Sequence, residues 1–430
     1  MFENLLAQDE VRSILRADIE SGRLPPTLLF SGPSASGKMT AALELARALG
    51  CANVEDGERA PWNCSCPSCV RHRVLAHPDL LILGGRSFPE EIPAALELLA
   101  RAPGKASSYF FVRAARKLLR RFDAALFEGE ESKFAKAATL VREAEESLDA
   151  MNPETASNGA LAPGAAEAAA KIAAVCARLE PLVADAPPVF MVRNAELWSR
   201  LAPLGERKTV IVENADRMQE SARNALLKIL EEPPESVRFV LLSSRRGSIM
   251  ATILSRSRSY SFRRRGPEGT ALVLERVFRS AEPAAGVDSF LAARRAFPPV
   301  EARELAETFL ASALAERPDA ASLPGPLAAL ARTAGGQGRG AADSLARLLE
   351  ATKDFGAKDE RYASSFKFFL EALASKLGDL LREEGMGAGG TALVALWAAA
   401  VRNARADYES WNRSPSLLAE TLLYEMGGRR

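Results

Sequence analysis

The chain has 430 residues, of which 26% are charged and 47% are hydrophobic, and its formal net charge is +1. At about 100–200 residues per domain this length predicts about two to four domains. The near-neutral charge excludes bulk attraction to nucleic acid as the main basis of function, although it leaves a local basic patch open. No apolar run reaches the ~18 residues of a membrane span, and the chain starts without the basic and apolar regions of a secretory signal, so we expect a cytoplasmic protein.

The first predicted elements are a helix, a strand and a second helix. An apolar stripe predicts a helix over residues 1–23, which Pro25 and Pro26 end. The apolar run 27–31 is typical of a buried parallel strand, and helical periodicity follows over 38–49. A second strand-like run covers 78–83.

Between the first strand and the second helix lies Gly-Pro-Ser-Ala-Ser-Gly-Lys at 32–38, the core of a phosphate-binding loop. Its glycines let backbone N–H groups face phosphate oxygens, and the helix N-terminus and the lysine add positive charge. The next residue should carry a hydroxyl that binds Mg²⁺, but Met39 stands there, and Thr40, about 100° further round the helix, should point away. Whether a nucleotide still binds stays open, and a plain Gly-rich turn is the alternative. The candidate ATP-contacting residues here are Gly32, Ser36, Gly37, Lys38, Met39 and Thr40.

A group of cysteines follows the second helix. Four thiolates satisfy tetrahedral Zn²⁺, and a Cys-x-x-Cys spacing commonly chelates it. In a reducing compartment such a group favours a metal over disulfides, with free or redox thiols as the alternative. His72 and His77 are nearby and could serve as spare ligands, but they are interpreted as surface or loop residues, and Cys176 is interpreted as a core residue. The candidate structural zinc ligands are Cys51, Cys64, Cys66 and Cys69.

Residues 88–186 change character and are predicted to be helices interrupted by a loop after residue 151. Five basic side chains recur along one predicted helix face in this region. They are interpreted as a solvated face, with phosphate contact as the alternative. These residues are Arg113, Arg116, Lys117, Arg120 and Arg121.

The α/β pattern returns from about residue 187, with strands predicted over 209–212 and 238–243 and a helix over 218–230. Such alternation predicts a parallel sheet covered by helices. In ATPases built on a phosphate-binding loop, a strand of this kind ends in an Asp that holds Mg²⁺ and a residue that orients the attacking water. Glu213 and Asn214 stand there, and Asn214 cannot accept a proton. With Met39, these departures predict that hydrolysis is absent or very slow.

Arg256 lies in Leu-Ser-Arg-Ser-Arg at 254–258, behind the last predicted strand. An exposed arginine is ordinarily a solvated charge, but this position also suits an arginine supplied in trans to a phosphoryl group on a neighbouring subunit. Arg263-Arg264-Arg265 is interpreted as a hinge between domains, because no strand signal follows and residues 268–430 are predicted to be helical.

Taken in order, these motifs resemble the AAA+ subunits of the bacterial replicative clamp loader. The strongest match is Asn-Ala-Leu-Leu-Lys-Ile-Leu-Glu-Glu-Pro-Pro at 224–234. The cysteines stand where that family has a four-Cys zinc module, and His77-Pro78-Asp79 is similar to the segment that follows it in delta-prime subunits. Ser255-Arg256-Ser257 is similar to the family's Ser-Arg-Cys segment. Residues 88–186 have no recognised counterpart and are interpreted as an insertion.

The resemblance implies an α/β fold with three parts. An AAA+ domain over 1–265 would carry a zinc module at about 51–69 and the insertion at about 88–186, followed by a helical lid over 266–325 and a helical collar over 326–430. It implies assembly with other clamp-loader subunits, and contact with the sliding clamp and primer-template DNA through the assembled complex.

Three functions remain open at this stage. In the first, the chain is a delta-prime-like stator with a degraded ATP site that presents Arg256 to an adjacent ATPase. In the second, it is a gamma/tau-type subunit that binds and hydrolyses ATP with Mg²⁺ itself. In the third, it is a non-replicative AAA+ scaffold whose insertion binds a partner. Met39, Glu213 and Asn214 favour the first.

Overall fold

The computed structural model divides into two compact units, Met1–Ala296 and Phe297–Arg430, each described here by itself. The structure describes residues 1–53, 60–85, 88–154, 164–184, 186–294, 299–315, 317–335, 360–411 and 413–427. Among these residues, no helix is long and apolar enough to cross a membrane. The division between the units lies inside the segment 266–325 that the resemblance assigns to a lid.

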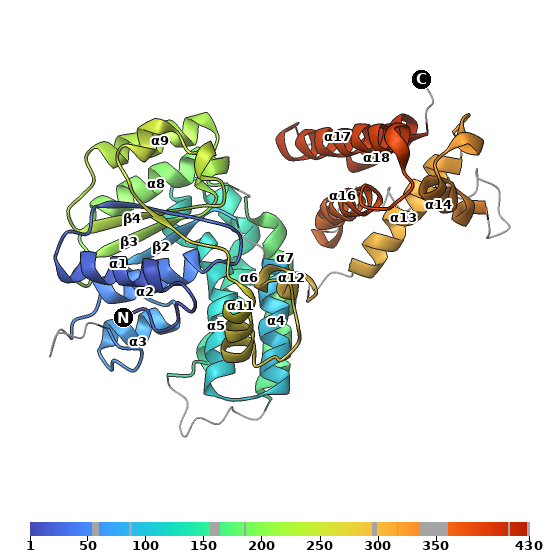
Figure 1. The fold of residues 1–430 in the computed structure, drawn as a ribbon. Coiled ribbons are helices and arrows are strands. Elements are labelled where there is room, and N and C mark those ends of the chain that lie inside the picture. Colours follow the sequence, from blue (N-terminus) through green and yellow to red (C-terminus); the bar gives the residue numbers. More distant parts are fainter. Residues whose placement is uncertain are drawn as a thin grey trace. The chain divides into compact units, whose positions relative to one another are not determined.

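The first unit is built around a five-stranded parallel sheet with the order β2-β3-β4-β1-β5 (Figure 1). The four buried, largely apolar strands confirm the predicted parallel sheet, because strands buried on both faces have continuous apolar sequences. Their bounds are β1 (Thr27–Ser31), β2 (Leu80–Leu83), β3 (Lys208–Val212) and β4 (Val237–Ser243). The strand β5 (Arg258–Ser261) was not predicted, since only Tyr260 of its side chains is buried.

Side chains alternate between the two faces of the sheet, as a period of two requires. Leu28 and Phe30 of β1 belong to the core under α1 (Asp9–Glu20) and α2 (Lys38–Leu49), while Leu29 belongs to the opposite core. That opposite core also holds α8 (Val189–Arg200), α9 (Glu220–Glu231) and the inserted helices (Figure 1).

Residues 1–8 are not helical, which corrects the prediction of a helix over 1–23. Phe2 and Ala7 have φ values of 60° and 52°, which a helix excludes. Phe2 and Leu5 are fully buried, so the apolar stripe reflects a segment of turns packed into the core on one face of the sheet rather than a longer helix.

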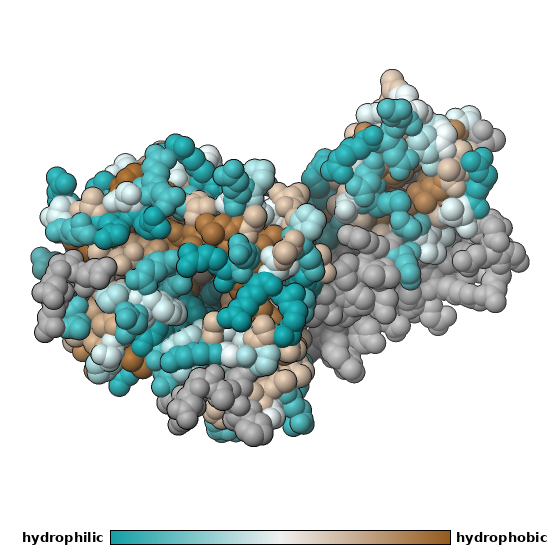
Figure 2. Space-filling view, turned by 60° about the horizontal axis from the view of Figure 1, so that its bottom comes forward, coloured by the Kyte–Doolittle hydropathy of each residue, from teal (hydrophilic) through white to brown (hydrophobic). Residues whose placement is uncertain are grey.

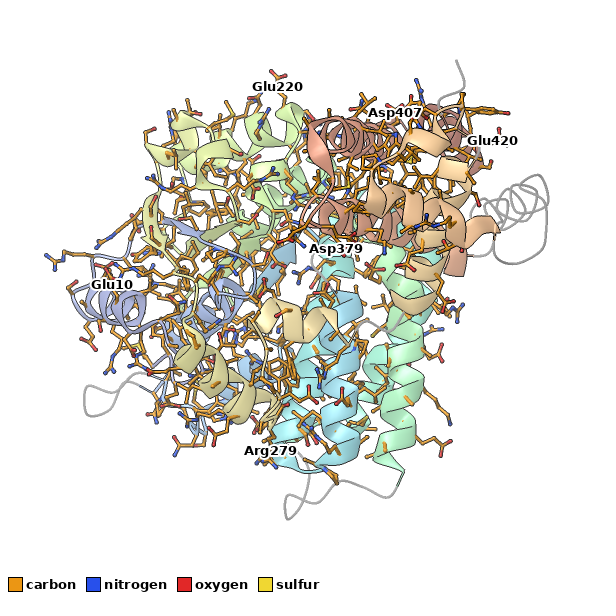
Figure 3. The ribbon with its side chains drawn as sticks, turned by 45° about the vertical axis from the view of Figure 1, so that its right-hand side comes forward. Glu10, Glu220, Arg279, Asp379, Asp407 and Glu420 are labelled. Atoms are coloured by element: carbon orange, nitrogen blue, oxygen red, sulfur yellow. The ribbon has the colours of Figure 1, made fainter. Side chains whose placement is uncertain are left out.

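The inserted region is helical, as predicted, and it joins the sheet to the helices that follow β5. Its elements are α4 (Phe88–Arg101), α5 (Lys105–Leu119), η2 (Arg120–Phe122), η3 (Ala124–Phe127), α6 (Glu131–Ala150) and α7 (Ala165–Leu179). On the side away from the sheet, α4 packs against α11 (Pro267–Phe278) and α12 (Val287–Ala292). Arg101 donates to the carbonyl oxygens of Phe278 at 2.7 Å and Arg279 at 3.2 Å. Arg279, the residue that follows α11, is labelled in Figure 3.

The second unit is helical throughout its described residues, with Phe309, Phe369 and Trp397 at the centre of its core. Exposed apolar side chains of this unit include Leu396 and Leu417. On the described surface, Figure 2 shows hydrophobic residues interspersed among hydrophilic ones. Its helices are α13 (Pro299–Ala315), α14 (Gly325–Gly335), α16 (Glu360–Leu380), α17 (Gly387–Trp411) and α18 (Pro415–Met426).

Candidate nucleotide and metal sites

The phosphate-binding loop has the backbone that its sequence predicts. It leaves β1 at Gly32 and enters α2 at Lys38, and Gly32 and Gly37 have φ values of 152° and 102°. A Cβ atom at Gly32 would lie 2.2 Å from the carbonyl oxygen of Phe262, so only glycine fits there. The buried hydroxyl of Ser36 has no hydrogen-bond partner among the described residues, which leaves a polar atom in the cradle for a phosphate oxygen.

Two cations of the chain itself lie on this loop. The Nζ atom of Lys38 donates to the carbonyl oxygens of Gly32 and Pro33, both at 2.6 Å. Arg265 donates through Nη1 to the carbonyl oxygen of Ala35 and through Nε to that of Leu6 at 3.2 Å, and burial lowers the pKa of its guanidinium. Sequence reasoning interpreted Arg265 only as part of a hinge, because its partners are distant in the chain.

The groups expected to hold Mg²⁺ do not fit that ion. Met39 is 4% exposed and packs in the core of α2, and it carries no oxygen. Glu213, at the end of β3, accepts a hydrogen bond from Nη2 of Arg121, which also donates through Nε to the carbonyl oxygen of Gly84 at 3.0 Å. Arg121 is 2% exposed, so this is a buried ion pair and not a surface contact. An arginine therefore lies against the carboxylate that would face a metal.

Asn214 is also committed to structure. Its φ is 53°, a left-handed conformation that asparagine tolerates better than most residues, and its Nδ2 donates to the carbonyl oxygen of Gly85 at 3.1 Å. The next acidic residue, Asp216, was not singled out from the sequence. Its Oδ1 is buried without a hydrogen-bond partner among the described residues, and its Oδ2 lies 3.3 Å from Nε of Arg245.

The four cysteines come together as predicted. Their sulfur atoms all lie within 4.8 Å of one another, with Cys51 at 3.8 Å from Cys64 and 4.0 Å from Cys66. A tetrahedral Zn²⁺ with bonds of about 2.3 Å places its sulfur ligands about 3.8 Å apart, so the donor set fits this metal. Burial would raise the pKa of Cys66, but hydrogen bonds led by the N–H of Cys69 lower it to about 7, which favours the thiolate form.

The two nearby histidines are buried, which corrects their interpretation as surface residues, although His77 does lie in a loop, the one before β2. The rings of His72 and His77 stack with centroids 4.1 Å apart. His77 accepts the N–H of Asp79 through Nδ1 at 3.1 Å, and the Asp79 carboxylate accepts the N–H groups of Leu204 at 2.9 Å and Gly205 at 2.7 Å. The His-Pro-Asp segment therefore ties the metal module to the loop before β3.

The basic face of α5 is neither solvated nor available to phosphates, which corrects both interpretations. Arg116 is 1% exposed and pairs with Glu145 and Asp149 of α6, and Lys117 pairs with Glu91 of α4. Arg113 and Arg120 donate to backbone carbonyl groups near the end of α3 (Pro67–Arg73).

Arg256 lies between α10 (Ala251–Leu254) and β5, and its side chain is 36% exposed. It donates to the carbonyl oxygen of Thr252 at 3.0 Å and to Oε1 of Glu231 at 3.1 Å. A pair of this exposure contributes at most about 1 kcal/mol, so a stronger anionic partner can displace Glu231.

A strand, a phosphate-binding loop and a helix on a five-stranded parallel sheet, with helices after the sheet, define this chain as an AAA+ type protein. Comparison with known families supports this class. The model of the family described as DNA polymerase III, delta subunit, matches residues 7–146 and 194–265.

The chain is also similar to individual subunits of DNA polymerase III. A gamma/tau subunit of DNA polymerase III from Mycobacterium tuberculosis is 24% identical over 277 residues, which are 64% of this chain and 31% of that protein. A delta-prime subunit from Haemophilus influenzae is 39% identical over 79 residues, or 18% of this chain and 24% of that protein. The chain thus spans about a third of the gamma/tau relatives' length.

A solved structure, the gamma subunit-related protein of Thermotoga maritima, aligns over 97% of this chain and 99% of its own with a TM-score of 0.37 and 14% identity. The family match and the curated relatives make the chain similar to the gamma/tau and delta-prime subunits of DNA polymerase III.

Proposed function

We propose that this chain is a delta-prime-like stator of the DNA polymerase III clamp loader. In this role it assembles with other loader subunits, does not hydrolyse ATP, and presents Arg256 to ATP on a neighbouring subunit while the sliding clamp is loaded onto primer-template DNA. The buried pair of Arg121 with Glu213 is the single observation that carries the proposal.

The pair matters because hydrolysis needs a carboxylate that faces the metal. In this chain Arg121 occupies that carboxylate, Met39 replaces the hydroxyl ligand, and Asn214 binds the carbonyl of Gly85. Three groups that ATP hydrolysis requires are therefore either replaced or bound to other parts of the chain. The phosphate cradle around Ser36 and Lys38 is compatible with weak binding of a nucleotide without Mg²⁺.

The role of Arg256 follows from its exposure and its weak partner. A guanidinium that stabilises a phosphoryl group in trans must reach beyond its own subunit, and such a group accelerates hydrolysis by about 10³–10⁵-fold. The exposed pair with Glu231 holds the arginine outward at little cost.

The four cysteines supply a structural zinc centre in this proposal. Four sulfur ligands leave no open coordination position, so the metal would have no catalytic role. Metal analysis of the purified chain tests this directly, and the expected content is one zinc per chain.

The decisive experiment measures DNA-stimulated ATP turnover in a loader reconstituted from this chain and its partner subunits. We expect Arg256→Ala to reduce turnover strongly and Arg264→Ala, a nearby exposed arginine, to leave it unchanged. The chain alone should show no turnover. Brisk hydrolysis by the chain alone, or unchanged turnover with Arg256→Ala, would contradict the proposal.

A gamma/tau-type motor is the second candidate, and the intact loop geometry at Gly32 and Gly37 favours it. Restoring the missing groups separates the two candidates. A variant with Met39→Thr, Glu213→Asp and Asn214→Glu still contains Arg121, so Arg121→Met must be added before Mg²⁺ can approach. For a stator descended from a motor, Mg²⁺-dependent nucleotide binding should rise only in the variant with all four changes.

A further inference from the structure

We propose that metal occupancy of the four-cysteine module and docking of the helical insertion are thermodynamically linked through Arg73 and three arginines of α5 and η2. We call Arg113, Arg116 and Arg120 the docking arginines. This inference rests on the proposed zinc centre, and it assigns the insertion a role in holding that centre together.

The first link is α3, which starts at the metal site and ends at the insertion. Cys66 is its N-cap, and the sulfur of Cys66 accepts the N–H of Cys69 at 3.3 Å, so two candidate ligands set the start of the helix. The last carbonyl groups of any helix lack partners within it. In α3 these groups face the insertion.

The docking arginines donate, in sequence order, to the carbonyl groups of the last residue of α3 and of the two residues that follow it. Arg113 donates to Arg73 at 2.8 Å, Arg116 to Val74 at 3.1 Å and Arg120 to Leu75 at 2.8 Å. Positions 113, 116 and 120 share one helix face. The three arginines therefore bind three consecutive carbonyl groups from one rigid surface. A shift of α3 would break all three contacts together.

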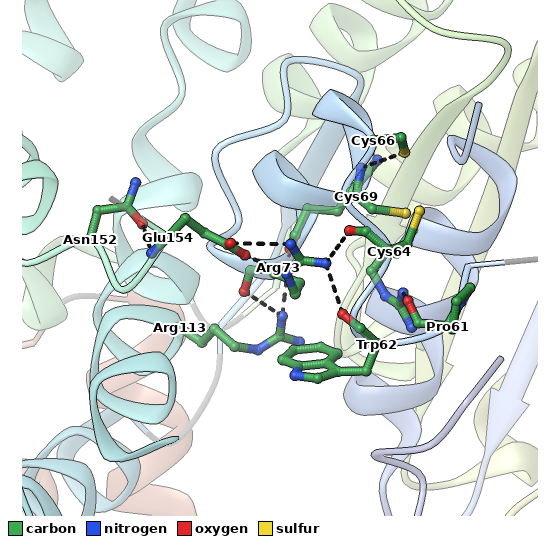
Figure 4. Close-up of polar contacts among 11 residues, drawn as sticks. Pro61, Trp62, Cys64, Cys66, Cys69, Arg73, Arg113, Asn152 and Glu154 are labelled. Atoms are coloured by element: carbon green, nitrogen blue, oxygen red, sulfur yellow. Dashed lines mark hydrogen bonds and ion pairs between the residues drawn. The ribbon is translucent and has the colours of Figure 1, made fainter. Parts of the chain in front are cut away.

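The second link is Arg73, which binds both sides of the interface (Figure 4). Its Nη1 donates to the carbonyl oxygens of Trp62 at 2.8 Å and Cys64 at 2.6 Å in the metal loop. Its Nε and Nη2 donate to the carboxylate of Glu154, which follows α6 in the insertion. The indole of Trp62 also lies under the guanidinium of Arg113, 5.6 Å away. The metal loop is therefore held by a side chain that the insertion itself holds.

The docked helix reaches the edge of the sheet at the residue after Arg120. Arg121 there binds Glu213 and the carbonyl oxygen of Gly84. One continuous series of polar contacts thus runs from the cysteines through α3 and α5 to the end of β3. Because α5 also packs in the apolar core, loss of metal should loosen these polar contacts without releasing the helix.

Linkage is reciprocal, so the same factor must appear from both ends. If docking favours the metal-bound loop, weakening the contact between Arg73 and Glu154 must speed metal loss. If the metal favours docking, removing the metal must expose Arg73 and the docking arginines.

The first arm of the test measures zinc transfer from the full-length chain to a chromogenic chelator. The variant Glu154→Gln removes the charge that holds Arg73 and keeps the shape of the side chain. Glu146→Gln changes an exposed carboxylate of α6 that has no ion pair among the described residues, and it is the matched control. We expect Glu154→Gln to release zinc about tenfold faster than the wild type, because losing groups that support metal ligands commonly weakens metal binding by about that factor or more. Glu146→Gln should release zinc at the wild-type rate.

The second arm measures amide hydrogen exchange in the wild type with and without bound zinc. We expect metal removal to raise exchange over 72–77 and 113–121, with no change over β4. Equal zinc release from Glu154→Gln and wild type would overturn the inference, as would unchanged exchange over 113–121. A purified chain without zinc would overturn both this inference and the metal centre, but it would leave the ATP turnover and Arg256 tests of the proposed function standing.

Discussion

Two segments of the first unit are both rich in arginine but differ in how deeply their arginines are buried. The arginines of α5 and η2 are buried or half-buried and bind carboxylates and backbone carbonyl groups of the same chain. Those between β4 and α11 are mostly exposed. Arg256 and Arg263 pair with exposed carboxylates, and the exposed side chain of Arg245 pairs with the buried carboxylate of Asp216. The first set is therefore structural, whereas the second is available to a partner. Variants in the two sets should differ accordingly.

The largest effect is expected at Arg121. Removing one partner of a buried ion pair leaves an uncompensated charge and costs about 3–5 kcal/mol. Arg121→Met should lower the free energy of unfolding by about that amount, measured by urea denaturation. Adding Glu213→Gln should recover much of the loss, since no buried charge then remains. An Arg121→Met variant as stable as the wild type would place Arg121 with the exposed set.

Arg116 should follow, with a loss of about 1–3 kcal/mol in Arg116→Met. The carbonyl group of Val74 would stay buried without its donor, and such a group costs about that much. The side chain of Asp149, 71% exposed, can turn to water when the arginine is lost, so the effect should be smaller than at Arg121. Urea denaturation of both variants in the same buffer tests the order.

The carboxylate of Glu154 gives a pH-dependent version of the comparison. Burial alone would raise its pKa, but the hydrogen bonds of Arg73 and Tyr109 and the charge of Arg73 lower it below the usual value. Because the folded pKa lies below the unfolded pKa of about 4.3, the stabilisation is fully present above that pH and is lost as pH falls through the folded pKa.

The matching measurement is the free energy of unfolding of wild type and Glu154→Gln between pH 7 and pH 3. We expect a gap of about 1–3 kcal/mol at pH 7, typical of a hydrogen bond to a charged group. The gap should begin to narrow as the pH falls below about 4.3 and should close as the pH falls through the lowered folded pKa of Glu154. A gap that stays constant over this range would show that the Arg73 contact does not depend on the charge of Glu154.

The difference between the two arginine sets also shows what the sequence could and could not predict. The strands β1 to β4 and the four cysteines were predictable, because continuous apolar runs and ligand spacing are local signals. The burial of the basic side chains of α5 and η2 was not predictable, because their partners are distant in the sequence. Arg121 contacts Glu213, which is 92 positions away, and Arg73 contacts Glu154, which is 81 positions away. A basic helix face looks the same in sequence whether it meets water, phosphate or carbonyl groups.

The same limit explains β5 and residues 1–8. The sequence of β5, Arg-Ser-Tyr-Ser, alternates weakly because an edge strand buries little, and only its pairing with β1 makes it a strand. At the N-terminus, the spacing of apolar residues was compatible with a helix, but backbone turns at Phe2 and Ala7 direct the same residues into the core.

The smallest effect on stability is expected at Arg256. A substitution there should change ATP turnover without a matching change in the free energy of unfolding. Its pair with Glu231 is exposed, so Arg256→Ala should change the free energy of unfolding by less than about 0.5 kcal/mol. The same variant should reduce ATP turnover of the assembled loader far more than any change in stability can explain. If a substitution leaves the fold intact and removes turnover in a neighbouring subunit, the replaced residue acts through its charge at the interface.

Arg121→Met should show the opposite pattern, with a large loss of stability and no gain of turnover by the chain alone, because Met39 and Asn214 still lack the groups that Mg²⁺ and water require.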